Sequence, residues 1–238
     1  MICGLYFINC ITRYVRLTLS SIIFDLDDTL IDREATMRKF LITQRQRLAR
    51  LLNCGDIEYA NSVLKFQNGG YADKRTAFQS ALFELNQEEV HVESIVNDYE
   101  SIYGNEAIAF PDVRNTLLEL RKVFSLGLIS NGRSKGQRNK IRSSNLDGLF
   151  DVVVISEEVG VKKPDPSIFV HCLKLLSVKA NCAAYVGDNP VNDIEPANQL
   201  GMISIWVENS KFAAPYNVGA TISNISDLAD AISALCPI

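Results

Sequence analysis

Residues 21–30 have the sequence SIIFDLDDTL, and this stretch decides the fold. The apolar run at its start is too short for a helix, and it predicts a buried strand that is covered on both faces. Asp25 and Asp27 follow at once in a D-x-D pattern. Two carboxylates spaced in this way can both face one crevice, although acidic turns and helix caps produce the same pattern. The stretch therefore predicts a strand that ends in a pair of acidic side chains.

Working outward, similar short apolar runs recur along the chain and alternate with helical stretches. The expected strands are 21–25, 125–130, 152–156, 183–188, 203–207 and 220–223. The expected helices between and after the later strands are 112–122, 134–145, 165–178, 193–200 and 226–235. Strand–helix–strand repetition predicts an α/β fold, with a Rossmann-like parallel sheet and helices on both faces. Functional side chains should then gather beyond the carboxyl ends of the strands.

One region interrupts the alternation. Residues 33–108 contain no convincing strand, and they predict amphipathic helices over 36–52, 57–66, 74–85 and 88–103. Asn68-Gly69-Gly70 is a turn signal in the middle of this region, and Pro111 closes it. We expect a helical insertion after the first strand, which serves either as additional core or as a lid.

Polar residues follow three later strands at corresponding positions. The second strand ends in Ser130-Asn131-Gly132, which is either an ordinary turn or a cradle for an oxyanion. The segment 160–165, GVKKPD, starts a helix and brings a lysine to the same edge. The segment 185–193, YVGDNPVND, adds two carboxylates, for which helix capping is the simpler interpretation. Each signal is weak alone, but four in succession at four strand ends are jointly strong.

Several carboxylates at one crevice repel one another strongly when they are buried. They stay ionised together only if a cation lies among them. Oxygen ligands favour Mg²⁺, which also binds substrate phosphates. The pattern therefore predicts a magnesium site beside a lysine.

Composition excludes several other classes of protein. The 238 residues include 24 Lys and Arg and 28 Asp and Glu, so the net charge of −4 argues against a nucleic-acid partner. The six cysteines form no C-x-x-C pair, which favours free thiols in the cytoplasm over zinc or redox motifs. The first apolar run, residues 1–12, is far shorter than the ~20 residues that span a bilayer. Residues 1–16 are interpreted as an N-terminal extension, with a membrane-surface anchor as the alternative.

The four motifs DLDDTL, LISNG, GVKKPDP and GDNPVND resemble those of the haloacid dehalogenase-like (HAD) hydrolases, in the same order. The resemblance covers about residues 20–238 and includes the flanks EEVGVKKPDPSIF and NDIEPANQLGM. It implies a core domain made of residues 17–32 and 109–238, and a helical cap domain over residues 33–108. This superfamily is dominated by Mg²⁺-dependent phosphatases.

The resemblance also implies catalytic roles. Asp25 would be the nucleophile that forms an aspartyl-phosphate. Asp27 would protonate the leaving oxygen and then deprotonate the hydrolytic water. Lys163 would neutralise the nucleophile and the phosphate, with its neighbour Lys162 as the alternative, although the family pattern places the lysine directly before proline. Asp28 is expected to be structural or solvated.

Binding roles follow from the same resemblance. Ser130 and the Asn131 N–H would hold phosphoryl oxygens, with Lys163 beside them, and Thr29 would orient the loop. Magnesium would be bound by a set of aspartates: the Asp25 carboxylate, the Asp27 backbone carbonyl, Asp188, and Asp193 either directly or through water. Pro196 stands where many relatives have glycine, and we interpret it as neutral for metal binding because the first helical turn tolerates proline.

In the family that the chain resembles, members that displace halide from carbon lack the second aspartate of the first motif. The presence of Asp27 at that position therefore favours phosphoryl transfer over dehalogenation. The expected function is hydrolysis of a small phosphorylated metabolite, such as a sugar phosphate, a nucleotide or a phosphoglycolate-like acid. A phosphomutase of the same fold is the main alternative, and a 2-haloacid dehalogenase or a non-catalytic binding module are further ones. Candidate substrate contacts from the cap are Arg33, Arg38, Tyr71 and Lys74, for each of which a solvated surface position is the competing interpretation. The chain is expected to be a monomer or a homodimer.

Overall fold

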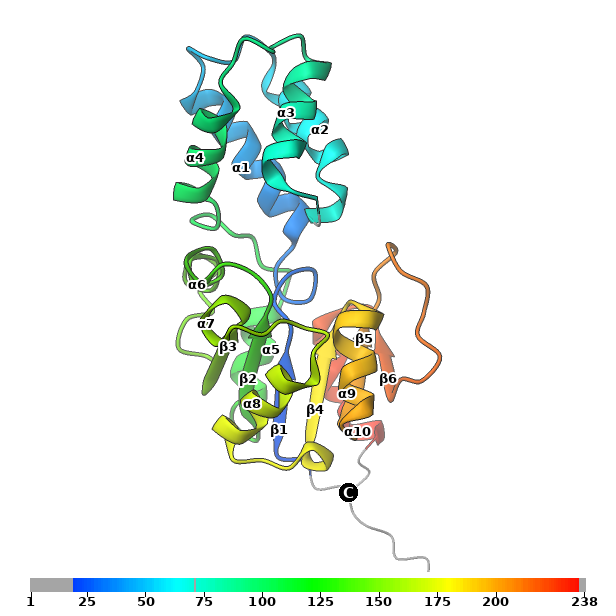
Figure 1. Cartoon of the computed structure of the whole chain (residues 1–238). Helices are drawn as coiled ribbons and strands as arrows, with labels where there is room; N and C mark the ends of the chain where they lie inside the picture. The colour runs from blue at the N-terminus through cyan, green and yellow to red at the C-terminus, as the bar shows by residue number, and fades with distance from the viewer. Residues whose placement is uncertain (1–18, 71, 236–238) are drawn as a thin grey trace, which may run out of the picture.

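The computed structural model describes residues 19–70 and 72–235, and its centre is a six-stranded parallel sheet (Figure 1). The strand order is β3-β2-β1-β4-β5-β6. The strands are β1 (Ser21–Phe24), β2 (Ser125–Ser130), β3 (Val152–Ile155), β4 (Ala183–Gly187), β5 (Ile203–Val207) and β6 (Ala220–Ile222). The predicted α/β fold is thus confirmed. The order reverses direction at β1, between β2 and β4, where α/β sheets bind their ligands.

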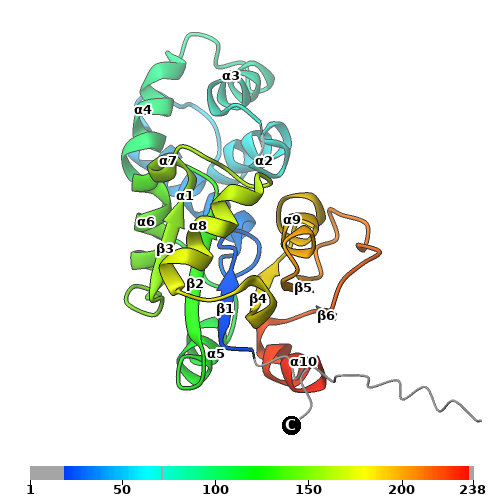
Figure 2. The same ribbon diagram turned by 60° about the horizontal axis from the view of Figure 1, so that its bottom comes forward.

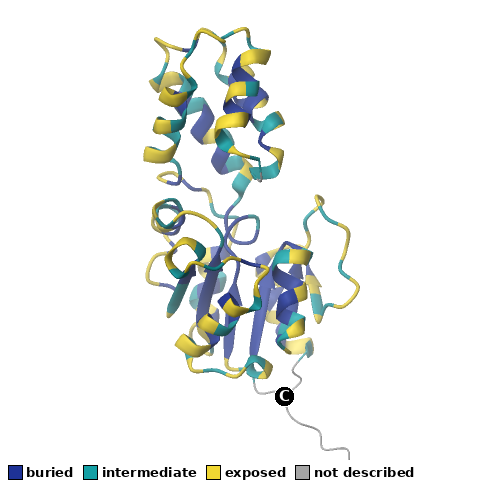
Figure 3. Cartoon of the chain, viewed as in Figure 1, coloured by how far each residue is buried: buried dark blue, intermediate teal, exposed yellow. Residues whose placement is uncertain are grey.

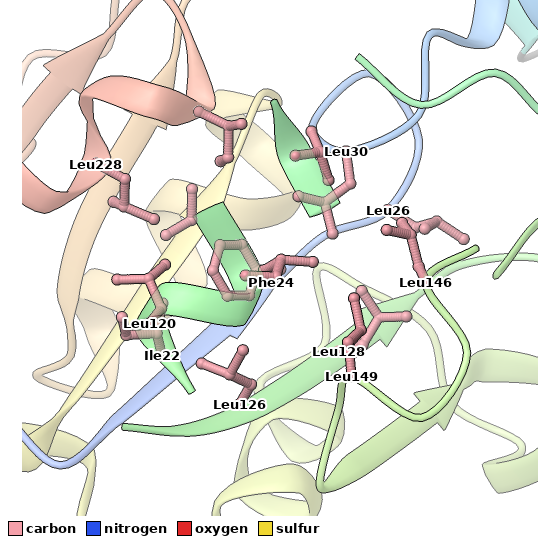
Figure 4. Packing of buried hydrophobic residues seen from close by; sticks show 14 of the residues in the cluster. Ile22, Phe24, Leu26, Leu30, Leu120, Leu126, Leu128, Leu146, Leu149 and Leu228 are labelled. Atoms are coloured by element: carbon pink, nitrogen blue, oxygen red, sulfur yellow. The ribbon is translucent and has the colours of Figure 1, made fainter. Parts of the chain in front are cut away.

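Helices cover both faces of this sheet because alternate residues of each strand point to opposite sides. Ile22 and Phe24 of β1 pack with α5 (Val113–Leu120) and α10 (Leu228–Leu235), as Figure 4 shows for part of this cluster. Ile23 between them packs on the other side, with α8 (Pro166–Leu176) and α9 (Glu195–Gln199). The strands are therefore buried throughout most of their length (Figure 3).

Local sequence determines where the helices of the sheet domain begin. Asp165 caps α8 by accepting a hydrogen bond from Ser167 N at 2.8 Å, and Pro166 occupies the first turn. The predicted helix 193–200 begins earlier, because a π-helical turn over Pro190–Ile194 precedes α9. Two further helices, α6 (Ser134–Ser143) and α7 (Ser156–Val159), follow β2 and β3 directly.

The region between β1 and α5 is helical, as predicted. It contains α1 (Arg33–Arg47), α2 (Asp56–Phe66), a short turn of 3-10 helix (Asn68–Gly70), α3 (Lys74–Glu84) and α4 (Val92–Ile102). These helices enclose an apolar cluster of their own around Phe40, Tyr59 and Phe78, separate from the two clusters of the sheet. Figures 1 and 2 show them beyond the carboxyl ends of the strands.

The insertion enters and leaves the sheet domain through two paired segments. Asp32 N donates to Ile108 O at 2.9 Å, and Phe110 N donates to Leu30 O at 3.0 Å. Ile31 and Ala109 form an antiparallel bridge between these bonds. Asp32 also caps α1, so this helix begins at Arg33, three residues before the predicted start.

The remaining expectations concern the termini and the cysteines. Residues 1–16 lie outside the described residues. Cys54, Cys172 and Cys182 carry free thiols. Within the described ranges, none of the helices combines the length and the apolar character needed to cross a membrane.

Candidate active site

The carboxyl ends of β1, β2 and β4 meet in a small polar pocket, and the segment after β3 closes its side. All predicted catalytic, phosphate-binding and metal-binding residues except Thr29 line this pocket: Asp25, Asp27, Ser130, Asn131, Lys163, Asp188 and Asp193. Arg33, Asn189 and Asn192 complete the lining. Thr29 is buried beside the pocket, and its hydroxyl lies 3.4 Å from Asp25 Oδ2. The fold thereby brings together side chains that lie far apart in the sequence.

The loop after β1 is what aims the first two carboxylates. Asp25 N donates to Val186 O at 2.9 Å, so the strand pairing continues one residue past β1. The chain then turns tightly, since both Leu30 N and Ile31 N donate to Leu26 O at 2.9 Å. Asp28 adopts a left-handed conformation with φ of 64° in this turn, as aspartate tolerates better than most residues. The turn leaves Asp25 and Asp27 buried at the base of the pocket.

Lys163 is the central cation of the pocket. Its Nζ contacts Asp25 Oδ1, and it lies 2.6 Å from Asp193 Oδ1 and 3.0 Å from the Tyr185 hydroxyl. Although burial opposes it, the charges of Asp193 and Asp25 raise the pKa of Lys163 above its ordinary value. Lys163 is only 3% exposed whereas Lys162 is exposed to solvent, so the structure places Lys163 at the site and not its neighbour.

Three buried carboxylates surround that cation. Oxygens of Asp25, Asp188 and Asp193 lie within 4.8 Å of one another. Burial raises the pKa of Asp25 to about 6 in spite of Lys163. Burial, followed by the charges of Asp25 and Asp193, raises the pKa of Asp188 to about 8. One lysine does not compensate three carboxylates, and oxygen ligands are those that Mg²⁺ prefers, so this donor set fits a divalent cation.

Asp27 belongs to a different group of contacts, which sequence reasoning missed. Lys140 Nζ lies 2.7 and 2.8 Å from the two Asp27 carboxylate oxygens, and Gln137 Nε2 donates to Oδ2 at 2.8 Å. Burial would raise the pKa of Asp27, but the charges of Lys140 and Arg33 hold it well below its ordinary value. Gln137 and Lys140 are buried polar residues one turn apart on α6, just after the Ser-Asn-Gly turn. Two polar residues one turn apart, so close to a motif, were the feature of the sequence that could have indicated their role.

The Ser-Asn-Gly turn is tied to both groups. Gln137 Nε2 lies 2.5 Å from Ser130 Oγ, so one amide contacts both Ser130 and Asp27. The Asn131 side chain donates from Nδ2 to Lys163 O at 2.9 Å and accepts from Lys163 N at 2.9 Å. This pair holds the backbone at Lys163, whose peptide bond to Pro164 is cis. Asn131 thus positions the lysine as well as lining the pocket.

The four candidates from the insertion have different outcomes. Arg33 lines the pocket, where its Nη1 donates to Gly69 O at 2.8 Å and its Nε lies 3.6 Å from Asp28 Oδ2. Arg38 instead pairs with Glu34 and is 41% exposed, so the structure does not bring it to the site. Tyr71 lies outside the described residues.

Lys74 lies close enough to the other cations to respond to them. Its Nζ donates to Gly70 O at 2.9 Å and to Ala72 O at 3.2 Å. Burial and then the charges of Arg33 and Lys140 lower the pKa of Lys74 to about 8. The insertion therefore presents positive charge toward the Asp27 side of the pocket.

Comparison of the sequence with known proteins identifies a family and several relatives. A protein-family model described as haloacid dehalogenase-like hydrolase matches residues 22–207. A glyceraldehyde 3-phosphate phosphatase from Pyrococcus furiosus is 32% identical over 199 residues, which cover 81% of this chain and 82% of the relative. A relative of the same name from Methanocaldococcus jannaschii is 28% identical over 91% of this chain and 98% of its own length.

A solved structure shares the arrangement of the helical insertion and the sheet. It is described as the putative HAD-hydrolase YfnB from Bacillus subtilis bound to magnesium, and it superposes with a TM-score of 0.72. The match covers 92% of this chain and 99% of that chain at 19% identity, so it supports the fold alone.

Proposed function

Because the chain belongs to the haloacid dehalogenase-like hydrolases and is a phosphatase of that family, we propose that it hydrolyses a small phosphomonoester through a phosphorylated Asp25. The observation that carries this proposal is the buried contact between Asp25 and Lys163, with Asp188 and Asp193 beside them. The lysine partly neutralises a carboxylate that must attack an anionic phosphate.

In the first step, an Asp25 oxygen attacks phosphorus and the bond from phosphorus to the leaving oxygen breaks. Lys163 offsets the negative charge of the two reacting groups, and Ser130 and the Asn131 N–H are positioned to hold phosphoryl oxygens. Asp27 gives its proton to the leaving oxygen. In the second step, water attacks phosphorus, loses a proton to Asp27, and releases phosphate from Asp25.

The contacts of Asp27 suit this double duty. Held by Lys140 and Gln137, its carboxylate is ionised, which is the form that accepts a proton from water. The negative charge of an arriving phosphate raises the pKa of a nearby carboxyl group, so Asp27 takes up a proton from solvent as the substrate binds and has it to donate in the first step.

The residues that would hold Mg²⁺ are Asp25, Asp188, Asp193 and the backbone carbonyl of Asp27. A bound Mg²⁺ would supply positive charge to the phosphoryl oxygens. The buried cluster of three aspartates, Asp25, Asp188 and Asp193, supports this assignment.

For the substrate, we propose a small phosphorylated metabolite, with glyceraldehyde 3-phosphate as the first compound to test. The support comes from the two relatives that carry this name and together align with most of the chain. Arg33 lines the pocket from the insertion, and we propose that it contacts the part of the substrate that remains after phosphate transfer.

The test is phosphate release from a panel of sugar, triose and nucleoside phosphates, with and without Mg²⁺, beside the Asp25→Asn variant. We expect Mg²⁺-dependent release that falls by at least about 10³-fold in the variant, because an amide is not a nucleophile for this step. Circular dichroism checks that the variant is folded. Isomer formation without phosphate release would indicate a mutase, and full activity in Asp25→Asn would overturn the mechanism.

A further inference from the structure

The loop that follows β5, residues 208–219, connects β5 to β6 and lies at that side of the sheet (Figure 1). It belongs to none of the four motifs, yet two of its side chains reach the site. Asn209 Nδ2 donates to Asp188 Oδ2 at 2.7 Å. Lys211 Nζ contacts Asp28 Oδ2 at 3.0 Å. The loop is therefore joined both to the carboxylate at the end of β4 and to the turn after β1.

The orientation of the Asn209 amide follows from a second hydrogen bond. Asn209 Oδ1 accepts from Lys211 N at 3.0 Å, which closes an Asx turn. A carbonyl oxygen is the only side-chain atom of asparagine that can accept this bond, so the NH₂ group must be the one that faces Asp188. The turn thus presents a donor, at fixed distance, to one oxygen of the carboxylate.

Asp188 is held at two points, by Trp206 near the end of β5 and by Asn209 in the loop that follows. Trp206 Nε1 donates to the Asp188 backbone carbonyl at 2.7 Å, and Asn209 holds the side chain. The Thr29 hydroxyl also approaches this carboxylate, but it lies farther away, 3.5 Å from Oδ1. Asn209 is accordingly the short contact that determines the rotation of this carboxylate.

We propose that Asn209 is a positioning residue for the metal ligand Asp188, an inference that rests on the proposed function. In this role it acts through Asp188, whose carboxylate it orients so that an oxygen faces Asp25 and Asp193. Partners that orient a ligating carboxylate typically contribute 10–100-fold to metal affinity. Without Asn209, the Asp188 carboxylate can rotate, and its oxygen then no longer lies close to the oxygens of Asp25 and Asp193.

The chain provides its own probe for this proposal, because Trp206 is its single tryptophan and hydrogen-bonds to Asp188. Mg²⁺ is titrated into the full-length protein while tryptophan fluorescence is followed. The variant is Asn209→Ser, whose hydroxyl can still accept from Lys211 N but is too short to reach Asp188. The matched control is Asn217→Ser, an exposed amide on the same loop.

We expect Asn209→Ser to raise the Kd for Mg²⁺ by about 10–100-fold and Asn217→Ser to change it by less than about twofold. Phosphatase activity of Asn209→Ser should recover when Mg²⁺ is raised in proportion. Unfolding in EDTA should be alike for the two variants, since a positioning role matters only when metal binds. Asn209→Thr, which keeps a hydroxyl acceptor, serves if the serine variant does not fold.

Equal Mg²⁺ affinity in Asn209→Ser and the parent protein would overturn the proposal while leaving the proposed function intact. The proposal would also be overturned if no Mg²⁺ concentration restored the phosphatase activity of Asn209→Ser and the variant were less stable in EDTA. That result would indicate a purely structural role for Asn209. Absence of any Mg²⁺ response in the parent protein would instead contradict the metal site itself.

Discussion

At the scale of single residues, the site separates its charges into two groups. Lys163 forms ion pairs with Asp25 and Asp193, whereas Lys140 forms one with Asp27. Both lysines are almost fully buried, and a buried charge persists only beside a partner. Asp25 and Asp27, the proposed nucleophile and the proposed acid/base group, therefore pair with different cations, and each cation can be tested separately.

Lys140→Met tests the second group. The change leaves the buried Asp27 carboxylate without its ammonium partner, so we expect a loss of about 3–5 kcal/mol of folding free energy at neutral pH. In the parent protein the pKa of Asp27 lies below its unfolded value, so this pair stabilises the fold above about pH 4 and the benefit is lost on acidification. In the variant, burial raises the pKa of Asp27, and protonation relieves the cost.

The difference in unfolding free energy between the parent protein and Lys140→Met should therefore be largest near pH 7 and decrease as the pH falls toward 4. Urea unfolding of both proteins across this range measures it. Lys135→Met, an exposed lysine on the same helix, is the control and should change stability little. A difference that is constant with pH would mean that Lys140 stabilises the fold through packing and not through Asp27.

At the scale of elements, close backbone packing fixes the acidic loop. A Cβ on Gly187, the last residue of β4, would lie 2.6 Å from the side-chain atoms of Asp193. We expect Gly187→Ala to push Asp193 from its place, with a loss of about 1–3 kcal/mol in stability and weaker Mg²⁺ binding. Chemical denaturation and the fluorescence titration measure these effects.

Gly136→Ala is the matched control for this change. Gly136 lies inside α6, and a Cβ there would meet no atom within 4 Å. Alanine is favoured over glycine in a helix, so this variant should gain about 0.5–1 kcal/mol in stability. Equal effects of the two substitutions would show that β4 and the Asp193 turn adjust freely to each other.

Elements also show what sequence can and cannot predict. The strands were predicted nearly to the residue, because short apolar runs that alternate with helices are typical of a parallel sheet covered on both faces. The motif aspartates, Ser130 and Lys163 were predicted because they lie at or beyond the ends of those strands and match the motifs of the family that the chain resembles. Gln137 and Lys140 were not, since polar residues on a helix normally indicate its solvated face. Asn209 was not predicted either, because its role depends on a turn that a sequence does not display.

At the scale of the whole molecule, the acidic cluster opposes folding when no metal is bound. The pKa of Asp188 is raised to about 8, above its unfolded value, so its contribution to stability is lost as the pH rises toward 8. Asp188→Asn removes that repulsion, and we expect the variant to be more stable than the parent protein in EDTA at pH 8, while losing phosphatase activity.

With Mg²⁺ present, the parent protein should instead be more stable than Asp188→Asn. At a free Mg²⁺ concentration of about 100 times Kd, binding stabilises the parent protein by about 2.7 kcal/mol, and Asp188→Asn should gain much less. Thermal unfolding with EDTA and with Mg²⁺ measures both effects. If Mg²⁺ raises the Tm of the two proteins equally, the cation acts elsewhere than at Asp188.

The paired segments at Ile31 and Ala109 have a consequence for engineering. Because the chain leaves and rejoins the sheet domain across a single antiparallel bridge, the two ends of the insertion are neighbours, one strand spacing apart. Any domain whose own termini lie side by side could be grafted between them without altering the register of β1, β2 or β4. The sheet domain thus has an attachment point for a different insertion: a graft replaces Arg33 but leaves in place the pocket residues that follow β1, β2 and β4.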